Sequence, residues 1–557
     1  MPRWNLASRL LLISTCAAAC PVLAAQAIGP GPGPVTTLPA VAQDVSPALS
    51  TLIANAAPLR TKQEDQARRE ARLAARAKAK QPPAAPREPV SPPPVAAGAA
   101  AVEQTVEGSR PAAPLLASFD GLGFGLGHVP PDTAPLRNPS DNSLAVGPDD
   151  IVQVVNSRFA IFSRSGELKY GPTSTRAIFA GFPGECGQVD FGDVVARYDQ
   201  LARRWVFVLP IFERPAGQES YAMCYAVSAG DNLLGRYYRY EFSRALFPDY
   251  PRLGVWTDGY YLGTSTGDTV IQKHACVAER SAMLRGRPAR EQCSIIDGVN
   301  FLNPADIDGR QTPPRGTPNL LFATGGTQLH GVFDATGIDY YSFHADWKDP
   351  ARSRVEGPYP VAVAPYHYLC NGQLTSCVPQ PGTSQRLDAQ GDKLMQRVVY
   401  RRIGKQQSIV AAHSVDTRGG GGGVRWYEFR LQSPTSVQLY QQGTYVPGGS
   451  FRWMPSIGMD RVGNMAVGYS HGDAGTYVGQ RLAGRLAGDH RGDMTLAETR
   501  LVDGAGAQTD TLRWEDYTTL SMDPADDCTF WYVGDYYQAG AEHYSSRIGA
   551  VRLPGCH

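Results

Sequence analysis

The sequence predicts an all-β fold over residues 118–557, on three observations. Turn residues recur every few positions, and the runs between them are short and rich in Val, Ile, Tyr, Phe and Trp, as in strands. No stretch of this region shows the helical period of apolar residues. Seven similar phrases follow one another. Because roughly 440 residues exceed what one sandwich usually holds, we predict a β-propeller, most simply of seven blades, with six or eight as the alternatives.

Each of these repeated segments, called phrases here, is expected to form one blade, in chain order. The phrases are residues 143–166, 193–242, 251–263, 319–343, 392–429, 455–469 and 513–551. In the last, the polar stretch Arg513–Tyr517 precedes a short strand, the acidic turn Asp523–Asp527 and an aromatic strand. Such turns tolerate positive φ and reverse the chain easily. We expect residues 118–125 to add an outer strand to this last blade and so to close the ring.

Residues 1–25 have the pattern of a secretory signal peptide. Arg3 and Arg9 flank the start of an apolar run, and small residues lead to an expected cleavage near Ala25. The apolar run falls well short of the roughly 20 residues that span a bilayer. Cys16 or Cys20 as a lipoprotein cysteine is the alternative.

Residues 26–117 are expected to form a disordered Ala/Pro-rich stalk outside the folded domain. Their composition offers little that could build a core. Within them, residues 61–80 favour a helix but hold one large apolar residue, Leu73, so this basic segment is expected to stay solvated. Contact with an anionic cell-surface polymer is the alternative reading.

The charge distribution argues against nucleic acid as a partner. The whole chain carries +1, but residues 60–80 alone hold eight Lys/Arg against three Asp/Glu, so the globular part is mildly acidic. No further stretch approaches transmembrane length. We therefore expect an exported protein, periplasmic, extracellular or at the cell surface, without a transmembrane segment and monomeric.

The cysteines indicate an oxidising compartment. Two of the ten lie in the expected signal, which leaves an even number, eight. The chain contains no CxxC pair, so a cysteine metal site is not indicated. Short loops close most easily. The expected pairs are Cys370–Cys377, Cys276–Cys293, Cys186–Cys224 and Cys528–Cys556.

Several phrases resemble a family of large secreted bacterial β-propeller proteins, loosely described as sialidase-like or BNR-type, without an established activity. The phrases are PPDT (130–133), SLAVGPDDIVQVVN (143–156), FPDYPRLGVWTDGYY (247–261), CVPQPGTSQRLD (377–388), RWMPSIGMDRVGNMAVGYS (452–470) and DPADDCTFWY (523–532). The resemblance covers about residues 119–557. It implies a fold and export, not a reaction.

Polar residues stand where the first strand of several blades should begin, near one mouth of the central channel. If the register is right, they converge on one pocket that grips hydroxyls and stacks on sugar rings or cations. The alternative is that each Asp caps a turn. The candidate binding residues are Asp141, Asp193, Asp249, Asp392, Arg452, Trp453, Trp514 and Asp516.

A metal site is a further possibility at residues 303–309, NPADIDG, which resemble half a calcium loop. Asp306 and Asp308 would be the ligands, although no Glu follows at the distance that such a loop requires. A structural turn is the alternative. Ca²⁺ is the one cofactor that the sequence suggests, and no catalytic residue is assigned.

Two functions follow from these patterns. The first is a secreted or surface propeller that binds a glycan or glycoconjugate at its channel mouth, with or without glycoside hydrolase or lyase activity. The second is a non-catalytic protein-interaction scaffold displayed on the stalk. A deep pocket with neighbouring carboxyl groups favours the first function, and Asp side chains engaged by backbone amides favour the second.

Overall fold

The computed structural model describes residues 32–59, 61, 63–64, 66–67, 98–126, 136, 138–188, 192–212, 221–265, 272–299, 301–325, 337–372 and 375–557. The expected signal peptide and most of the basic segment 61–80 lie outside these ranges. Among the described residues, no helix is both long and apolar enough to cross a membrane.

The described strands form antiparallel meanders of four, numbered here 1 to 7 in chain order. Their bounds are as follows: β5 (Ser143–Val146), β6 (Asp150–Val155), β7 (Arg158–Ser163) and β8 (Leu168–Ser174) in meander 1; β9 (Val195–Asp199), β10 (Arg204–Ile211), β11 (Tyr221–Ser228) and β12 (Tyr237–Arg244) in meander 2; β13 (Asp249–Val255), β14 (Tyr260–Ser265), β15 (Lys273–Ala278) and β16 (Arg290–Ile296) in meander 3; β17 (Asn303–Asp308), β18 (Asn319–Gly325), β19 (Gly337–His344) and β20 (Arg354–Val361) in meander 4; β21 (Val398–Ile403), β22 (Gln406–Asp416), β23 (Gly422–Ser433) and β24 (Ser436–Tyr445) in meander 5; β25 (Phe451–Met459), β26 (Met465–Asp473), β27 (Thr476–Arg485) and β28 (Thr499–Val502) in meander 6; β29 (Thr519–Met522), β30 (Thr529–Tyr536), β31 (Ser545–Arg552) and β4 (Leu115–Asp120) in meander 7.

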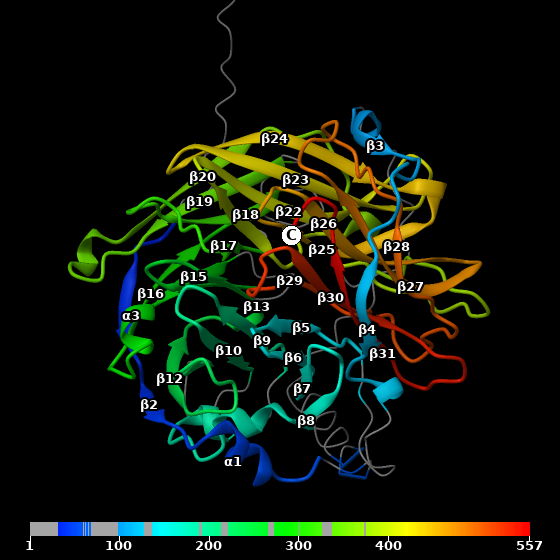
Figure 1. Ribbon diagram of the computed structural model, residues 1–557. Helices are drawn as coiled ribbons and strands as arrows, with labels where there is room; N and C mark the ends of the chain where they lie inside the picture. The colour runs from blue at the N-terminus through cyan, green and yellow to red at the C-terminus, as the bar shows by residue number, and fades with distance from the viewer. Residues whose placement is uncertain are drawn as a thin grey trace, which may run out of the picture.

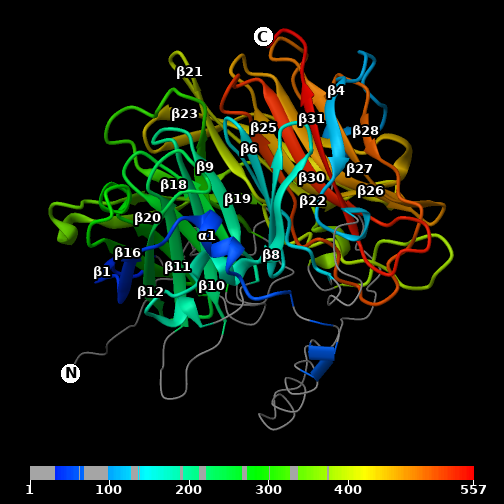
Figure 2. The same cartoon turned by 60° about the horizontal axis from the view of Figure 1, so that its bottom comes forward.

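The meanders stand side by side in a ring, as in a β-propeller (Figures 1 and 2). Their first strands contact one another in chain order, and β29 returns to contact β5. Parallel pairing of β17 with β21 joins meanders 4 and 5 into one hydrogen-bonded sheet. The predicted count of seven blades corresponds to counting these two meanders separately.

The ring is closed by a strand from the N-terminal side of the chain. β4 pairs with β31, with Asp120 opposite Arg547 and Ala117 opposite Ala550. The expectation that the segment beginning at residue 118 supplies an outer strand to the last meander is therefore confirmed, although the strand starts at Leu115 and ends at Asp120.

Neighbouring meanders pack through apolar side chains on both faces, so the middle strands are almost wholly buried. Between meanders 6 and 7, the Tyr532 ring lies over Gly468. A Cβ placed on Gly468 would lie 2.4 Å from Tyr532 Cδ2. Because the ring is itself enclosed, it has little room to move away.

We therefore expect Gly468→Ala to destabilise the protein by about 1–3 kcal/mol through overpacking. Urea unfolding monitored by tryptophan fluorescence measures this change. Gly488→Ala is the matched control, because no atom lies within 4 Å of a Cβ at that position. Equal stability of the two variants would contradict this account of the interface.

A belt of N-terminal residues, 32–54 and 98–120, runs around the outer rim of the ring (Figure 1). β1 (Thr36–Pro39) pairs with β16, and β2 (Ala42–Val45) pairs with β12. Helix α1 (Leu49–Ala54) contacts meander 1. On the other side, β3 (Glu103–Gln104), after the 3-10 turn η1 (Ala99–Val102), pairs with β24.

The belt corrects the expectation of a stalk for residues 32–54 and 98–117. Their low apolar content was the basis of that expectation, but an added strand needs only the unpaired backbone groups at a sheet edge. Side chains then fix the position. Asp44 accepts hydrogen bonds of 2.8 and 2.6 Å from the buried Arg239, and Leu49 is fully buried.

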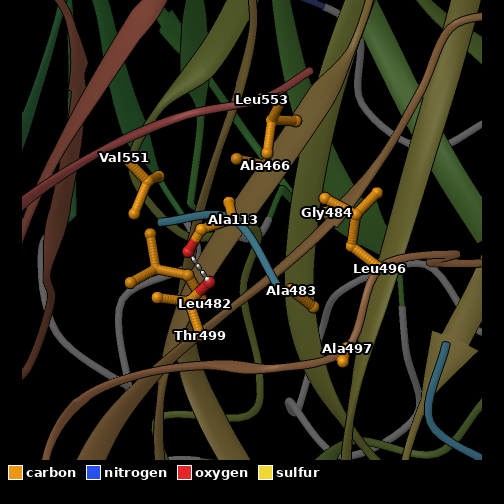
Figure 3. Close-up of a pocket in the computed structure, with 10 residues that line it drawn as sticks. All are labelled: Ala113, Ala466, Leu482, Ala483, Gly484, Leu496, Ala497, Thr499, Val551 and Leu553. Carbon is orange, nitrogen blue, oxygen red and sulfur yellow. Dashed lines mark hydrogen bonds between the residues drawn. The ribbon is translucent and has the colours of Figure 1, made fainter. Parts of the chain in front are cut away.

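Where the belt crosses meanders 6 and 7, it closes a small apolar cavity of about 10 Å³ (Figure 3). Thr499 Oγ1 donates a 2.7 Å hydrogen bond to the carbonyl of Ala113 there. A space of this size holds a water molecule at most. This cavity is therefore a packing defect beneath the belt and not a ligand site.

Short helices and 3-10 turns complete the chain. They are η2 (Phe124–Leu126), η3 (Thr175–Phe179), η4 (Glu185–Gly187), α3 (Arg280–Met283), η5 (Pro350–Arg352), η6 (Leu369–Asn371) and η7 (Pro447–Gly449).

The four expected disulfides form, pairing Cys186 with Cys224, Cys276 with Cys293, Cys370 with Cys377 and Cys528 with Cys556. They indicate an exported protein that folds in an oxidising environment.

Candidate binding site at the channel mouth

The first strands of the meanders all begin at one end of the ring, which we call the channel mouth. Asp141 and Asp193 each stand two residues before such a strand, β5 and β9, and Asp249 is the first residue of β13. Asp516 precedes β29, and Asp392 precedes β21. The topology thus brings carboxyl groups from widely separated parts of the sequence to one place.

Left-handed backbone recurs at this end of the ring. Eight residues there have φ between 33° and 64°, a region that disfavours residues other than glycine. They are Asp141, Asp193, Tyr250, Phe301, Gln390, Met454, Glu515 and Asp516. Such conformations persist only where the surroundings enforce them, and they cluster at binding sites.

Asn156, at the end of the β6 hairpin, holds two of the carboxyl-bearing residues together. Its Nδ2 donates to Asp141 Oδ2, and its Oδ1 accepts a 3.0 Å hydrogen bond from the backbone N–H of Asp193. The carboxyl group of Asp193 also lies close enough to that of Asp141 to raise its pKa. Asp141 is 3% exposed, and its Oδ1 has no donor from an amide, hydroxyl or cationic group.

A second group of polar residues comes from the two long loops before β21 and β29. Arg513 Nε donates to Asp516 Oδ1 at 3.0 Å, and Gln390 Nε2 donates to the same oxygen at 3.1 Å. Lys393 Nζ lies 2.5 Å from Asp392 Oδ1 and also donates to Gln390. Asp392 therefore joins the mouth through Lys393 and Gln390.

Three carboxyl groups of the mouth, those of Asp141, Asp193 and Asp249, have raised pKa values. Burial, and then the charges of Asp193 and Asp516, raise the pKa of Asp141 well above its ordinary value. Burial also raises the pKa of Asp193. The pKa of Asp249 is raised to about 8, by burial first and then by the charges of Asp193 and Asp516. A protonated carboxyl group donates as well as accepts hydrogen bonds.

The mouth has an accessible rim and a buried floor. Asp193 and Asp249 are half-buried, and the Arg513 side chain is 34% exposed. Behind them, Asp141 and Asp516 are almost wholly enclosed. A ligand that reached the floor would therefore first meet two carboxyl groups and one guanidinium.

Three of the residues expected at this site lie elsewhere or are inaccessible. Arg452 forms a buried ion pair with Glu498 within meander 6, with 2.8 Å between Nε and Oε1. Trp453 and Trp514 are 0% and 1% exposed, and their ring centroids lie 6.4 Å apart inside an apolar cluster. The indoles stabilise the loops over the channel and present no face to a sugar.

Asp306 and Asp308 do not form a calcium loop, because residues 303–308 are strand β17. Their oxygens accept hydrogen bonds from arginines: Arg397 Nε lies 2.7 Å from Asp306 Oδ2, and Arg397 Nη1 lies 3.1 Å from Asp308 Oδ2. Within the described residues, the only cluster with metal-ligand spacing is Cys276, Glu291 and Cys293, and its cysteines form a disulfide.

Sequence reasoning missed several residues of the mouth: Asn156, Tyr250, Gln390, Lys393 and Arg513. Arg513 carried a usable signal, since it stands three residues before Asp516 in the polar stretch that opens the last phrase. The contributions of Gln390 and Lys393 depend on the path of the loop that follows meander 4, for which the sequence holds no repeat to use as a guide.

No protein-family model matches this chain, and no curated protein matches it. Solved structures resemble it at low similarity. A protein of unknown function from Dyadobacter fermentans is 9% identical, with 80% of this chain and 100% of that chain covered and a TM-score of 0.35. The polysaccharide lyase Uly1 is 8% identical, with 81% and 99% covered and a TM-score of 0.28.

The GH32 β-fructofuranosidase BmSUC1 of Bombyx mori is 9% identical, with 82% of this chain and 95% of that chain covered and a TM-score of 0.26. These scores are too low to support an argument about function, so the propeller assignment rests on the sheets themselves. No family model supports the resemblance to secreted bacterial propellers.

Proposed function

We propose that this exported β-propeller binds a glycan at its channel mouth through Asp141, Asp193, Asp249 and Asp516. The supporting observation is that four carboxyl groups from four meanders lie together with the Arg513 guanidinium, and that two of them reach the accessible rim. Carboxyl and guanidinium groups form directional hydrogen bonds with sugar hydroxyls. Asp141 Oδ1 is buried without a hydrogen-bond partner, so it is available to one of these hydroxyls.

The same site has the groups that acid–base chemistry on a glycosidic bond requires. Asp249, with a pKa of about 8, holds its proton at neutral pH. Asp516 is ion-paired with Arg513. A proton donor beside a charged carboxylate is the pair that glycosidases use. We therefore include hydrolase or lyase activity in the proposal as its second, separately testable part.

One observation favours the alternative function, a non-catalytic interaction scaffold. The buried tryptophans leave the mouth without the aromatic platform on which many sugars stack. A scaffold would not depend on the hydrogen bonds of the Asp193 and Asp249 carboxyl groups, whereas a glycan site would.

The test is glycan-array screening followed by calorimetry on the wild type, Asp193→Asn and Asp249→Asn. We expect each variant to bind the selected glycan at least about tenfold more weakly, because the Asn amide cannot reproduce the hydrogen bonds of the carboxyl group and a buried group left without its partner costs about 1–3 kcal/mol. Asp231→Asn is the control, since that side chain is 57% exposed on the outer surface. Unchanged affinity in both mouth variants would reject this site, and assay of the reducing ends released separates binding from cleavage.

A further inference from the structure

Arg252 is a buried cation at the channel mouth, and two of its three side-chain nitrogens have no hydrogen-bond partner. It lies in β13, three residues beyond Asp249, and is 3% exposed. Its guanidinium carbon stands 3.6 Å from the ring centroid of Tyr250 and 4.8 Å from that of Tyr517. Nη1 donates to the carbonyl of Pro251 at 3.2 Å, but Nε and Nη2 have no hydrogen-bond partner.

The position of this side chain is set by an irregularity in β13. The pairing with β14 shifts between Asp249 and Arg252, and Tyr250 between them has φ of 54°. Bulges of this kind re-aim side chains beside binding sites. Tyr250 is held in turn, because its hydroxyl donates to the carbonyl of Asp516.

Two other cations of the mouth already have counter-ions in the protein. Arg513 is paired with Asp516, and Lys393 with Asp392. Lys393 and Lys273 lie over the Phe301 ring, at 4.3 and 5.6 Å from its centroid. Three cationic side chains, those of Arg252, Lys273 and Lys393, thus lie against the aromatic rings of Tyr250 and Phe301.

We propose that Arg252 receives the oxyanion of an acidic sugar, a carboxylate or a sulfate ester, while the Asp residues bind its hydroxyls. This inference rests on the glycan-binding function proposed above and names the ligand class. A buried guanidinium without a counter-ion is costly. Nε and Nη2 form the edge that engages two oxygens of one anion at once.

The first measurement uses chondroitin sulfate oligosaccharides, which carry both anions, together with their desulfated and carboxyl-reduced derivatives. We expect wild-type protein to bind the parent at least tenfold more tightly than one of the two derivatives. The derivative that loses affinity identifies the anion. If the protein binds glycans but all three oligosaccharides equally, the inference is overturned while the glycan site stands. If no neutral or acidic glycan binds, both proposals fail.

The second measurement compares Arg252→Met with Arg252→Lys. We expect Arg252→Met to abolish the preference for the parent oligosaccharide, with binding of the derivative that lacks the recognised anion unchanged. Arg252→Lys keeps the charge but loses the two-donor edge, so it should retain only part of the preference and guards against a folding defect in the Met variant. Arg500→Met, at a side chain 70% exposed, is the control. A preference that survives in both Arg252 variants would overturn the assignment.

Discussion

Replacing Arg397 by Leu is expected to destabilise the protein by about 3–5 kcal/mol, because the substitution leaves the buried Asp308 without its ion-pair partner and removes one of the two arginines that pair with Asp306. Arg397 Nε lies 2.7 Å from Asp306, and Nη2 lies 2.5 Å from Asp308, with all three side chains 3–4% exposed. Asp306 also accepts a 3.1 Å hydrogen bond from Arg197 of β9. The pairs thus join meanders 2, 4 and 5 around the channel.

Thermal and urea unfolding at low and high salt measure this effect. Since burial shields the pairs from ions, the loss should persist at high salt. Arg500→Leu is the matched control, because the Arg500–Asp503 pair is 70% and 52% exposed and should contribute less than about 1 kcal/mol. Similar losses for the two variants would show that the channel pairs do not hold the ring together.

The second large effect concerns pH. Burial and the charges of Asp193 and Asp516 raise the folded-state pKa of Asp249 to about 8, whereas an unfolded Asp titrates near 3.9. Between these values the folded protein binds more protons than the unfolded chain, so stability falls as pH rises from about 4 to about 8. One such group contributes a slope of at most about 1.4 kcal/mol per pH unit.

Asp249→Asn is therefore expected to flatten the pH dependence of unfolding and to be more stable than the wild type at pH 8. Melting temperatures from pH 4 to pH 9 measure the slope. Asp231→Asn, on the outer surface, should retain the wild-type slope. A wild-type profile that rises toward pH 8, or an Asn variant that follows the wild type, would contradict the charge repulsion at the mouth.

Much of the ring could be predicted from sequence, because each meander repeats a local pattern of strand, polar turn and strand. The same patterns placed Asp141, Asp193 and Asp249 near the starts of β5, β9 and β13. The disulfide pairing could also be predicted from the sequence, because cysteines separated by short loops pair most easily. These properties depend on residues close together in the chain.

What the sequence could not reveal depends on contacts between distant residues. Trp453 and Trp514 look like ligand platforms in sequence, and only packing shows that they lie inside an apolar cluster. Asp306 looks like a calcium ligand until Arg397 is found beside it, on the other side of a long loop. The belt was missed because its pairing uses backbone groups, which leave little trace in composition.

The closing strand sets an order on folding. Residues near 118 pair with residues near 549, so this sheet brings together parts of the chain separated by nearly the whole propeller. During synthesis, β4 must stay unpaired until β31 has been made, because β31 lies near the C-terminus. Completion of the circle is thus a late event in folding, and until then the unpaired edges of β4 and β31 can bind chaperones or other nascent chains.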